Sequence, residues 1–239
     1  MSGSRRSMTT TPHTPPPAGA VFDVNETLSD IRGLAANLEE VGAGPELLPA
    51  WFAATLRDGF ALTAARARAD FASIAVSTLA DMLRDVTNVR GGPVAAAKHV
   101  VGAMADLDLH PDVAPGLRIL VDAGVRIATL SNSAARVAES LLERAGLRDL
   151  VDQCLSVSDA GCWKPAPDAY AYAARRCDVE RGDLVLIAVH PWDVDGARRA
   201  GLRTGWISRD DGAYPPFFLG PEATGRDLPE LATTLTTGR

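Results

Sequence analysis

Residues 184–193 read LVLIAVHPWD. Six consecutive apolar residues are typical of a parallel β-strand that is covered by helices on both faces. The run stops at His190 and Pro191, and the acidic Asp193 follows two residues later. This stretch predicts a buried strand that ends in a polar loop.

Similar apolar runs lie on either side of this strand. The run 20–22 ends at Asp23 and the run 125–130 ends at Ser131, with further runs near 154–157 and around Trp206. Helical patterns separate these runs, around residues 116–123, 135–145 and Tyr170. Alternating strands and helices are typical of a parallel, doubly wound sheet, so the predicted fold class is α/β.

A different pattern fills the chain between the first two strands. Ala, Leu and Arg dominate there, and Phe52, Leu56 and Phe60 lie four residues apart, as on one face of a helix. We interpret residues 33–110 as an inserted helical cap, and residues 20–32 with 111–239 as the core. Residues 1–19 are rich in Ser, Thr and Pro, which predicts a disordered tail.

Composition limits the classes of partner. The 239 residues carry a net charge of −6 and lack any extended basic cluster, which argues against nucleic-acid or membrane-surface binding. The three cysteines form no CxxC motif, which favours a reducing, cytoplasmic setting. An anionic ligand would therefore be held by local groups rather than by the overall field of the protein.

Polar residues follow four of the predicted strands. They are Asp23 with Thr27, Ser131 with Asn132, Lys164, and His190 with Asp193. The carboxyl ends of strands in such sheets border the ligand crevice, so these side chains are expected to meet. Each has a simpler interpretation as a helix cap or a solvated loop residue. Together they suit covalent catalysis by a carboxylate that a lysine holds in place.

The order and spacing of these motifs resemble the haloacid dehalogenase superfamily. The resemblance starts near residue 20 and rests on Asp23-x-x-x-Thr27, Leu130-Ser131-Asn132, Lys164-Pro165 and Trp192-Asp193. It implies a Rossmann-like core with a helical cap. Trp192 and the tyrosine six residues after the lysine, Tyr170, are most similar to the type II 2-haloacid dehalogenases.

Magnesium-dependent phosphatases of the same superfamily are the main alternative. Their pattern has an acidic residue two positions after the nucleophile, where this chain has Asn25, which cannot transfer a proton. A magnesium-binding aspartate of their last motif is replaced by Val189. A halide leaving group needs no proton, so these differences favour a dehalogenase without a cofactor.

The resemblance also implies residue roles. Asp23 would attack the halogen-bearing carbon and form an aspartyl ester, which water would hydrolyse to give a 2-hydroxy acid. Lys164 would orient Asp23, Asp193 would hold Lys164, and Thr27 would fix the nucleophile loop. The substrate would be bound by the remaining residues: Ser131 at its carboxylate, Asn132 at the halide, and Tyr170 with Trp192 along the pocket wall.

Three positions depart from the family pattern. The halide-binding arginine of the cap is replaced by Phe52, interpreted either as core packing or as an apolar pocket wall. Ala188 and His190 replace a serine and an asparagine that help to place the hydrolytic water. His190 is either a strand-end imidazole satisfied by the backbone or a general base for that water, since imidazole titrates near neutral pH.

Two broader expectations complete the sequence-based view. Related enzymes are often homodimers, so the resemblance suggests a homodimer that acts on a small anionic substrate. A non-enzymatic binding role is the alternative from another class. The departures at Phe52, Ala188 and His190 favour it, whereas Asp23, Lys164 and Asp193 favour catalysis.

Overall fold

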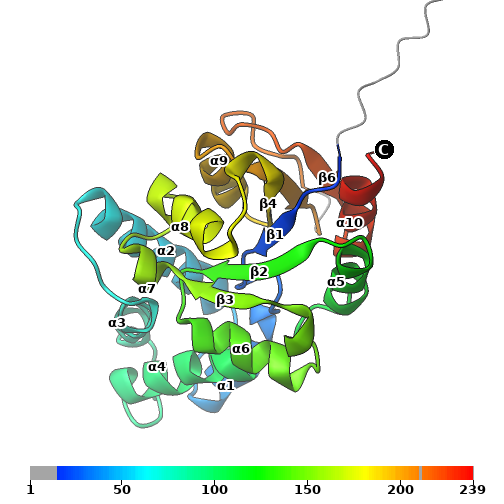
Figure 1. The fold of residues 1–239 in the computed structure, drawn as a ribbon. Helices are drawn as coiled ribbons and strands as arrows, with labels where there is room; N and C mark the ends of the chain where they lie inside the picture. The colour runs from blue at the N-terminus through cyan, green and yellow to red at the C-terminus, as the bar shows by residue number, and fades with distance from the viewer. Residues whose placement is uncertain (1–14, 210–211, 239) are drawn as a thin grey trace, which may run out of the picture.

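A six-stranded parallel sheet forms the centre of the protein (Figure 1). The computed structural model describes residues 15–209 and 212–238. The strand order is β3-β2-β1-β4-β5-β6. Their bounds are β1 Gly19–Phe22, β2 Arg126–Ser131, β3 Gln153–Ser156, β4 Leu184–Ala188, β5 Arg203–Ile207 and β6 Ala223–Gly225. This confirms the predicted α/β fold class.

The central strand β1 shows why the sheet is buried on both faces. Val21 pairs with Ala128 of β2 and Leu186 of β4. Successive side chains of a strand point to opposite faces. Accordingly, Val21 belongs to one apolar cluster, whereas Ala20 and Phe22 belong to another.

Helices cover the two faces of this sheet. Helices α5 and α10 lie side by side and carry apolar side chains of the cluster that contains Phe22. Tyr170 of α8 and Val194 of α9 belong to the cluster that contains Val21. The bounds of the helices that follow β1 in the core are α5 Val113–Asp122, α6 Ala135–Arg144, α7 Val157–Ala160, α8 Pro167–Cys177, α9 Pro191–Arg199 and α10 Leu228–Thr237.

The chain between residues 31 and 106 is helical, as its sequence pattern predicts. The α-helices are α1 Ala35–Glu40, α2 Leu47–Ala64, α3 Phe71–Leu83 and α4 Pro93–Gly102. The indole N–H of Trp51 in α2 donates to the Ala75 carbonyl oxygen of α3 at 2.8 Å, which ties these helices together. The segments that enter and leave the helical block lie side by side, because His110 N donates to Leu28 O at 2.9 Å. The division into cap and core at residues 33–110 stays a prediction.

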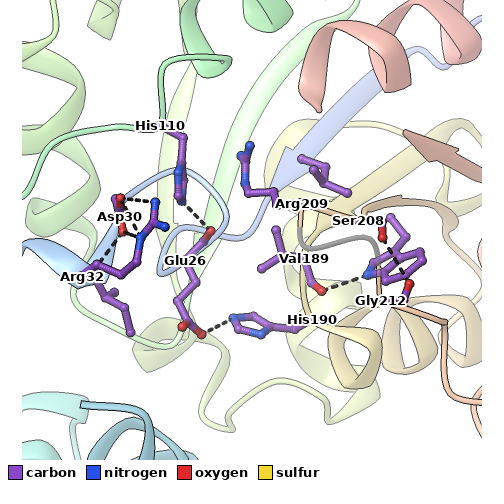
Figure 2. Close-up of a pocket in the computed structure, with 12 residues that line it drawn as sticks. Glu26, Asp30, Arg32, His110, Val189, His190, Ser208, Arg209 and Gly212 are labelled. Atoms are coloured by element: carbon purple, nitrogen blue, oxygen red, sulfur yellow. Dashed lines mark hydrogen bonds and ion pairs between the residues drawn. The ribbon is translucent and has the colours of Figure 1, made fainter. Parts of the chain in front are cut away.

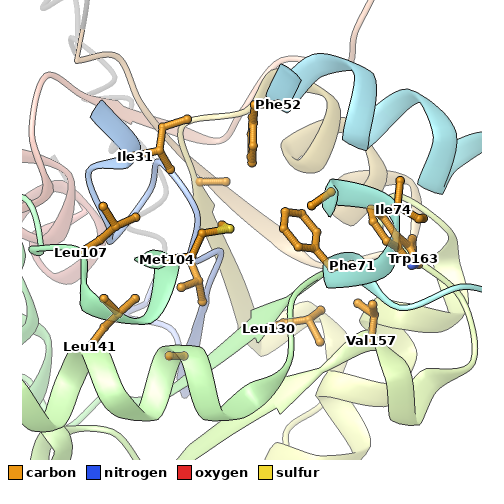
Figure 3. Close-up of a cluster of buried hydrophobic side chains, with 14 of the residues drawn as sticks. Ile31, Phe52, Phe71, Ile74, Met104, Leu107, Leu130, Leu141, Val157 and Trp163 are labelled. Carbon is orange, nitrogen blue, oxygen red and sulfur yellow. The ribbon is translucent and has the colours of Figure 1, made fainter. Parts of the chain in front are cut away.

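One apolar cluster continues from the core into the helical block. Phe71 of α3 stacks on Trp163, with ring centroids 5.7 Å apart, and both lie near Leu130 and Val157 (Figure 3). Trp163 immediately precedes Lys164. Packing between α3 and this tryptophan therefore fixes the backbone from which the lysine extends.

Some elements differ from the sequence expectations. Gly19 already belongs to β1, and Ala18 N donates to Asp183 O at 2.9 Å, so the last two residues of the expected tail join the sheet. Residues 1–14 lie outside the described residues. Strand β6 and helix α10 were not predicted. A three-residue strand has no apolar run, although Asp227, which caps Glu230 N at 2.8 Å, is a recognisable helix-start signal.

None of the helices in the described ranges combines the length and apolar character needed to cross a membrane. The expected cytoplasmic setting and the expected lack of membrane and nucleic-acid partners remain predictions. The same holds for the homodimer.

Helix α2 approaches Trp163 at Gly59, where a side chain has no room. A Cβ on Gly59 would lie 2.2 Å from the indole ring. We expect Gly59→Ala to lower the free energy of unfolding by about 1–3 kcal/mol, because the overpacking outweighs the gain of up to about 1 kcal/mol that alanine brings to a helix. Urea unfolding measures this. Gly102→Ala is the control, since nothing lies within 4 Å of its Cβ. Equal stability of the two variants would contradict the prediction.

Candidate active site

Asp23 lies at the end of β1, at the edge of the sheet where the other predicted site residues also gather. It is 4% exposed, and its N–H donates to Ile187 O of β4 at 3.1 Å. Thr27 Oγ1 donates to Asp23 Oδ2 at 2.7 Å and accepts from Val189 N at 3.1 Å. Thr27 thus joins the loop after β1 to the end of β4, which fits the predicted loop-fixing position.

Lys164 bridges the two predicted catalytic carboxylates. Its Nζ lies 2.7 Å from Asp23 Oδ1 and 2.6 Å from Asp193 Oδ2, and its side chain is completely buried. Asp23 and Lys164 are 141 residues apart in the sequence. The structure therefore brings together the carboxylate, the ammonium and the second carboxylate that the motifs predict.

Opposing effects set the ionisation of these three groups. Burial raises the pKa of Asp23, but the electrostatic effects of Lys164 and His190, with hydrogen bonds from Lys164 and Thr27, outweigh it and hold the pKa below its usual value. For Asp193, burial dominates and the pKa is raised. Burial lowers the pKa of Lys164, but Asp193 and Asp23 more than offset this and raise it. Asp23 is thus kept ionised by its neighbours.

Tyr170 completes the surroundings of Asp193. Its hydroxyl donates to Asp193 Oδ1 at 2.6 Å and lies 3.1 Å from the Asp193 carbonyl oxygen. Burial, followed by the charge of Asp193, raises the pKa of Tyr170 well above its usual value, so the phenol stays protonated as a donor. Gly196 permits the approach, since a Cβ there would lie 2.7 Å from the hydroxyl oxygen. Tyr170 contacts the second carboxylate rather than only lining a pocket.

The residues predicted to bind substrate after β2 make internal hydrogen bonds. Asn132 Oδ1 accepts from Lys164 N at 3.0 Å, and Ser131 Oγ accepts from Ser133 N at 2.9 Å. Ser133 in turn accepts from Asn25 Nδ2 at 2.8 Å, a contact that the sequence interpretation missed. These bonds hold the loops around Asp23 and Lys164 together, and the substrate-binding roles of Ser131 and Asn132 remain predictions.

Aromatic side chains line the side of the site that faces the helical block. Trp192 makes an edge contact with Phe60 of α2 at a centroid distance of 5.0 Å, and Lys164 Nζ lies 5.9 Å from the Trp192 ring centre. Phe52 is buried in the core cluster and its ring centroid lies 6.1 Å from that of His190, which supports core packing. Its role as an apolar pocket wall stays a prediction. Arg57 pairs with Asp58 and is largely exposed, so it does not replace the missing cap arginine.

His190 lies directly before α9 and next to the nucleophile. Its Nε2 is 3.2 Å from Asn25 O and 3.6 Å from Asp23 Oδ2. With Val189, it lines a cavity of about 500 Å³ (Figure 2). The bond to a backbone carbonyl matches the simpler of its two interpretations. Because a carbonyl oxygen only accepts, a general-base role would fall to Nδ1, and that role stays a prediction.

The family model of haloacid dehalogenase-like hydrolases matches residues 18–201 of this chain. The chain belongs to this family. The match includes Asp23, Lys164 and Asp193, so the superfamily resemblance inferred from the motifs is confirmed.

Relatives of this haloacid dehalogenase-like hydrolase include named dehalogenases. An (S)-2-haloacid dehalogenase 4A of Burkholderia cepacia is 30% identical, covering 84% of this chain and 87% of its own. An (S)-2-haloacid dehalogenase of Pseudomonas fluorescens is 26% identical, and the match covers 91% of this chain and 96% of that protein. A solved dehalogenase with an intermediate complex superposes with a TM-score of 0.84 at 27% identity, covering 94% of this chain and 99% of that one.

Magnesium does not fit among the site residues of this haloacid dehalogenase-like hydrolase. The four carboxylate oxygens of Asp23 and Asp193 are engaged by Lys164, Thr27 and Tyr170. Mg²⁺ needs oxygen ligands, and the aliphatic side chain of residue 189 offers none. Within residues 15–209 and 212–238, no group of three or more His, Cys, Asp or Glu is placed to hold a metal ion.

Proposed function

We propose that this protein is a 2-haloacid dehalogenase that converts a small 2-haloacid and water into a 2-hydroxy acid, a halide ion and a proton. The observation that carries the proposal is the placement of the Lys164 ammonium between Asp23 and Asp193, at 2.7 and 2.6 Å. The ammonium group stabilises the negative charge of the Asp23 carboxylate, which must be ionised to act as the nucleophile. The names and coverage of the relatives support the same substrate class.

The first step is displacement of the halide by Asp23. One carboxylate oxygen attacks the carbon that bears the halogen, a carbon–oxygen bond forms, and the carbon–halogen bond breaks with its electron pair on the halide. The lowered pKa of Asp23 supplies the ionised oxygen. Lys164 and Thr27 hold the carboxylate by one oxygen each, which orients it for attack.

The second step is hydrolysis of the resulting aspartyl ester. Water attacks the Asp23 carboxyl carbon, and the bond between this carbon and the ester oxygen breaks. One proton of the water passes to the leaving alkoxide, which gives the 2-hydroxy acid, and the other is released to solvent as the Asp23 carboxylate is restored. Lys164 lies beside the oxygen on which negative charge develops, which lowers the barrier electrostatically. Asp193 and Tyr170 keep the ammonium in place.

The residue two positions after the nucleophile favours this chemistry over phosphate transfer. Asn25 Nδ2 donates to Ser133 Oγ at 2.8 Å, and an amide cannot protonate an alkoxide leaving group. Halide leaves without a proton. Phosphate-ester hydrolysis by another member of the superfamily is the alternative that the same assay tests.

A metal-free halide-release screen tests the function. We expect halide release from chloroacetate and 2-chloropropionate at the same rate with and without EDTA. The measurement follows halide by ion chromatography and the released proton by a pH indicator. Phosphate release from p-nitrophenyl phosphate that requires added Mg²⁺, together with no halide release, would contradict the proposal.

The likeness to (S)-2-haloacid dehalogenases adds a stereochemical expectation. We expect (S)-2-chloropropionate to be consumed faster than the R enantiomer, and the product to be (R)-lactate, because backside displacement inverts the carbon once. Chiral chromatography of both substrate and product measures this. Retention of configuration would contradict a single displacement by Asp23. The cytoplasmic location and a homodimer are part of the same proposal.

A further inference from the structure

His190 and Glu26 make a contact beside the nucleophile that the proposed reaction does not use (Figure 2). His190 Nε2 lies 3.5 Å from Glu26 Oε2, in addition to its approach to Asn25 O at 3.2 Å and Asp23 Oδ2 at 3.6 Å. Carbonyl and ionised carboxylate oxygens only accept hydrogen bonds. The ring therefore turns a protonated Nε2 towards the nucleophile loop.

The backbone at Glu26 indicates that its side chain has a role. Its φ is 63°, a left-handed conformation that glycine adopts freely and that residues with a Cβ avoid. The Glu26 carbonyl oxygen is held by His110 Nε2 at 3.0 Å. The chain thus places a long acidic side chain where glycine would be less strained, and such strain gathers at functional sites.

Two aromatic rings fix the orientation of the imidazole. Trp192 stacks on His190 with centroids 5.1 Å apart and planes 20° apart, and Phe52 lies on it at 6.1 Å and 27°. The imidazole side chain is 13% exposed. Because the ring cannot turn freely between these neighbours, its Nε2 is kept towards Asp23 and Glu26.

The charges of the site call for a further cation. Asp23, Glu26 and Asp193 bring three carboxylates to Lys164 and His190. If the imidazole is neutral, the net charge of these five groups is −2, which repels an anionic substrate. The cap arginine that would offset this charge in related enzymes is replaced here by Phe52. A protonated imidazole adds one positive charge and reduces this net charge to −1.

We propose that His190 acts as an imidazolium that admits the anionic 2-haloacid, and that Glu26 is a positioning residue that keeps this ring protonated. The proposal rests on the proposed function. His190 is then a specificity residue for anionic substrates, and it supplies from the segment between β4 and α9 the positive charge that Phe52 does not supply from α2. A general base would need the opposite protonation state.

Other charged groups near the ring bear on this equilibrium. Asp23 and Glu26 approach it from the loop after β1, Lys164 lies beyond Asp23, and α2 contributes the uncharged Phe52. Asp193, in α9, faces Lys164 rather than the ring. The cavity that the ring lines also contains charged residues from other elements: Asp30, Arg32, His110 and Arg209. Only Glu26 and Asp23 have carboxylate oxygens within 4 Å of Nε2 among the described residues.

The pH dependence of kcat/KM for chloroacetate tests the proposal. An imidazolium role predicts activity that falls as pH rises and the ring loses its proton. Glu26→Gln and Glu26→Gly remove the neighbouring charge, so this alkaline limb should move to lower pH by about 0.5–1 unit. Glu26→Gly also relieves the backbone, so its melting temperature should be unchanged or higher. Glu39→Gln, in the exposed part of α1, is the matched control and should leave the limb in place.

His190→Gln separates charge from hydrogen bonding. Its amide retains a donor for Asn25 O but carries no charge, so KM for chloroacetate should rise about tenfold or more with a smaller change in kcat. Wild-type kinetics in this variant, or activity that rises with pH as the imidazole deprotonates, would overturn the proposal. Accumulation of aspartyl ester in this variant would assign the base role instead.

Nuclear magnetic resonance provides a readout that does not need turnover. The ring Cε1–H signal of His190, assigned by its loss in His190→Gln, should titrate at lower pH in Glu26→Gln than in the wild type. An unmoved midpoint overturns the inference even when halide is released normally. If the titration midpoint of His190 moves but no 2-haloacid is hydrolysed, the proposed function is wrong, whereas the electrostatic coupling between Glu26 and His190 is supported.

Discussion

Asp23→Asn is expected to reduce halide release by about 10³-fold or more, the scale seen when a nucleophile is removed from an active site. The amide is a far weaker nucleophile than the carboxylate. The structure places this carboxylate between Lys164 Nζ and Thr27 Oγ1, both at 2.7 Å, so no other carboxylate can take its position without moving both. Steady-state halide release from chloroacetate measures the loss.

The control for this substitution is Asp58→Asn, which neutralises a carboxylate that pairs with Arg57 away from the site. We expect its activity to match the wild type. Circular dichroism and thermal melting check that Asp23→Asn still folds, since the amide oxygen can accept from Lys164 and the amide nitrogen can donate to Thr27 Oγ1. Unchanged activity of Asp23→Asn on every substrate would reject both the dehalogenase and the phosphatase proposals.

Isotope labelling distinguishes the covalent route from direct attack by water. In a single turnover with excess enzyme in H₂¹⁸O, the aspartyl-ester route places ¹⁸O in the Asp23 carboxylate, because water attacks its carboxyl carbon. The 2-hydroxy acid then carries an unlabelled oxygen that came from Asp23. Mass spectrometry of the peptide containing Asp23 reads this directly. Label in the product alone would indicate direct hydrolysis.

Lys164→Met is expected to lower the free energy of unfolding by about 3–5 kcal/mol, because it leaves buried carboxylates without their cation. Both Asp23 and Asp193 are bound to this one ammonium at 2.7 and 2.6 Å. For a chain of this size the loss corresponds to a drop in melting temperature of roughly 10 °C. Halide release should also fall, since Asp23 loses its orienting partner.

A double variant isolates the cause of this loss. The double variant Lys164→Met with Asp193→Asn removes one of the two carboxylates that lose their cation, so we expect it to recover part of the stability lost in Lys164→Met. Urea unfolding of the two single variants and the double variant measures the coupling. If the changes in the free energy of unfolding of the two single variants add up to that of the double variant, the contact between Lys164 and Asp193 does not contribute to stability, which would contradict the prediction.

The order of elements could be predicted because their signals are local. Buried parallel strands require continuous apolar runs, as in residues 184–189, and helices require apolar spacing of three to four. Their polar ends meet by the geometry of the sheet. This argument correctly brought Asp23, Lys164 and Asp193 together. It missed β6, since the three residues Ala223–Gly225 carry no apolar pattern of their own.

The contacts within the site depend on the path of the backbone. The Asn132 side chain accepts from Lys164 N at 3.0 Å, a contact that the sequence pattern did not predict. Its predicted contact with the halide stays a prediction. No sequence motif indicated a functional role for Glu26. Its carboxylate reaches His190 through a left-handed turn, and a one-dimensional pattern of apolar residues does not contain that turn.

The sequence by itself determined that this chain forms a parallel α/β sheet with a helical insertion, an aspartate directly after the first strand and a lysine in a later loop. Burial and periodicity encode these features within a few neighbouring residues. Only the tertiary structure decided which charges face one another. Contacts such as Asp23 to Lys164, across 141 residues, or His190 to Glu26, from two separate segments, depend on distances of a few ångströms that many parts of the chain set together.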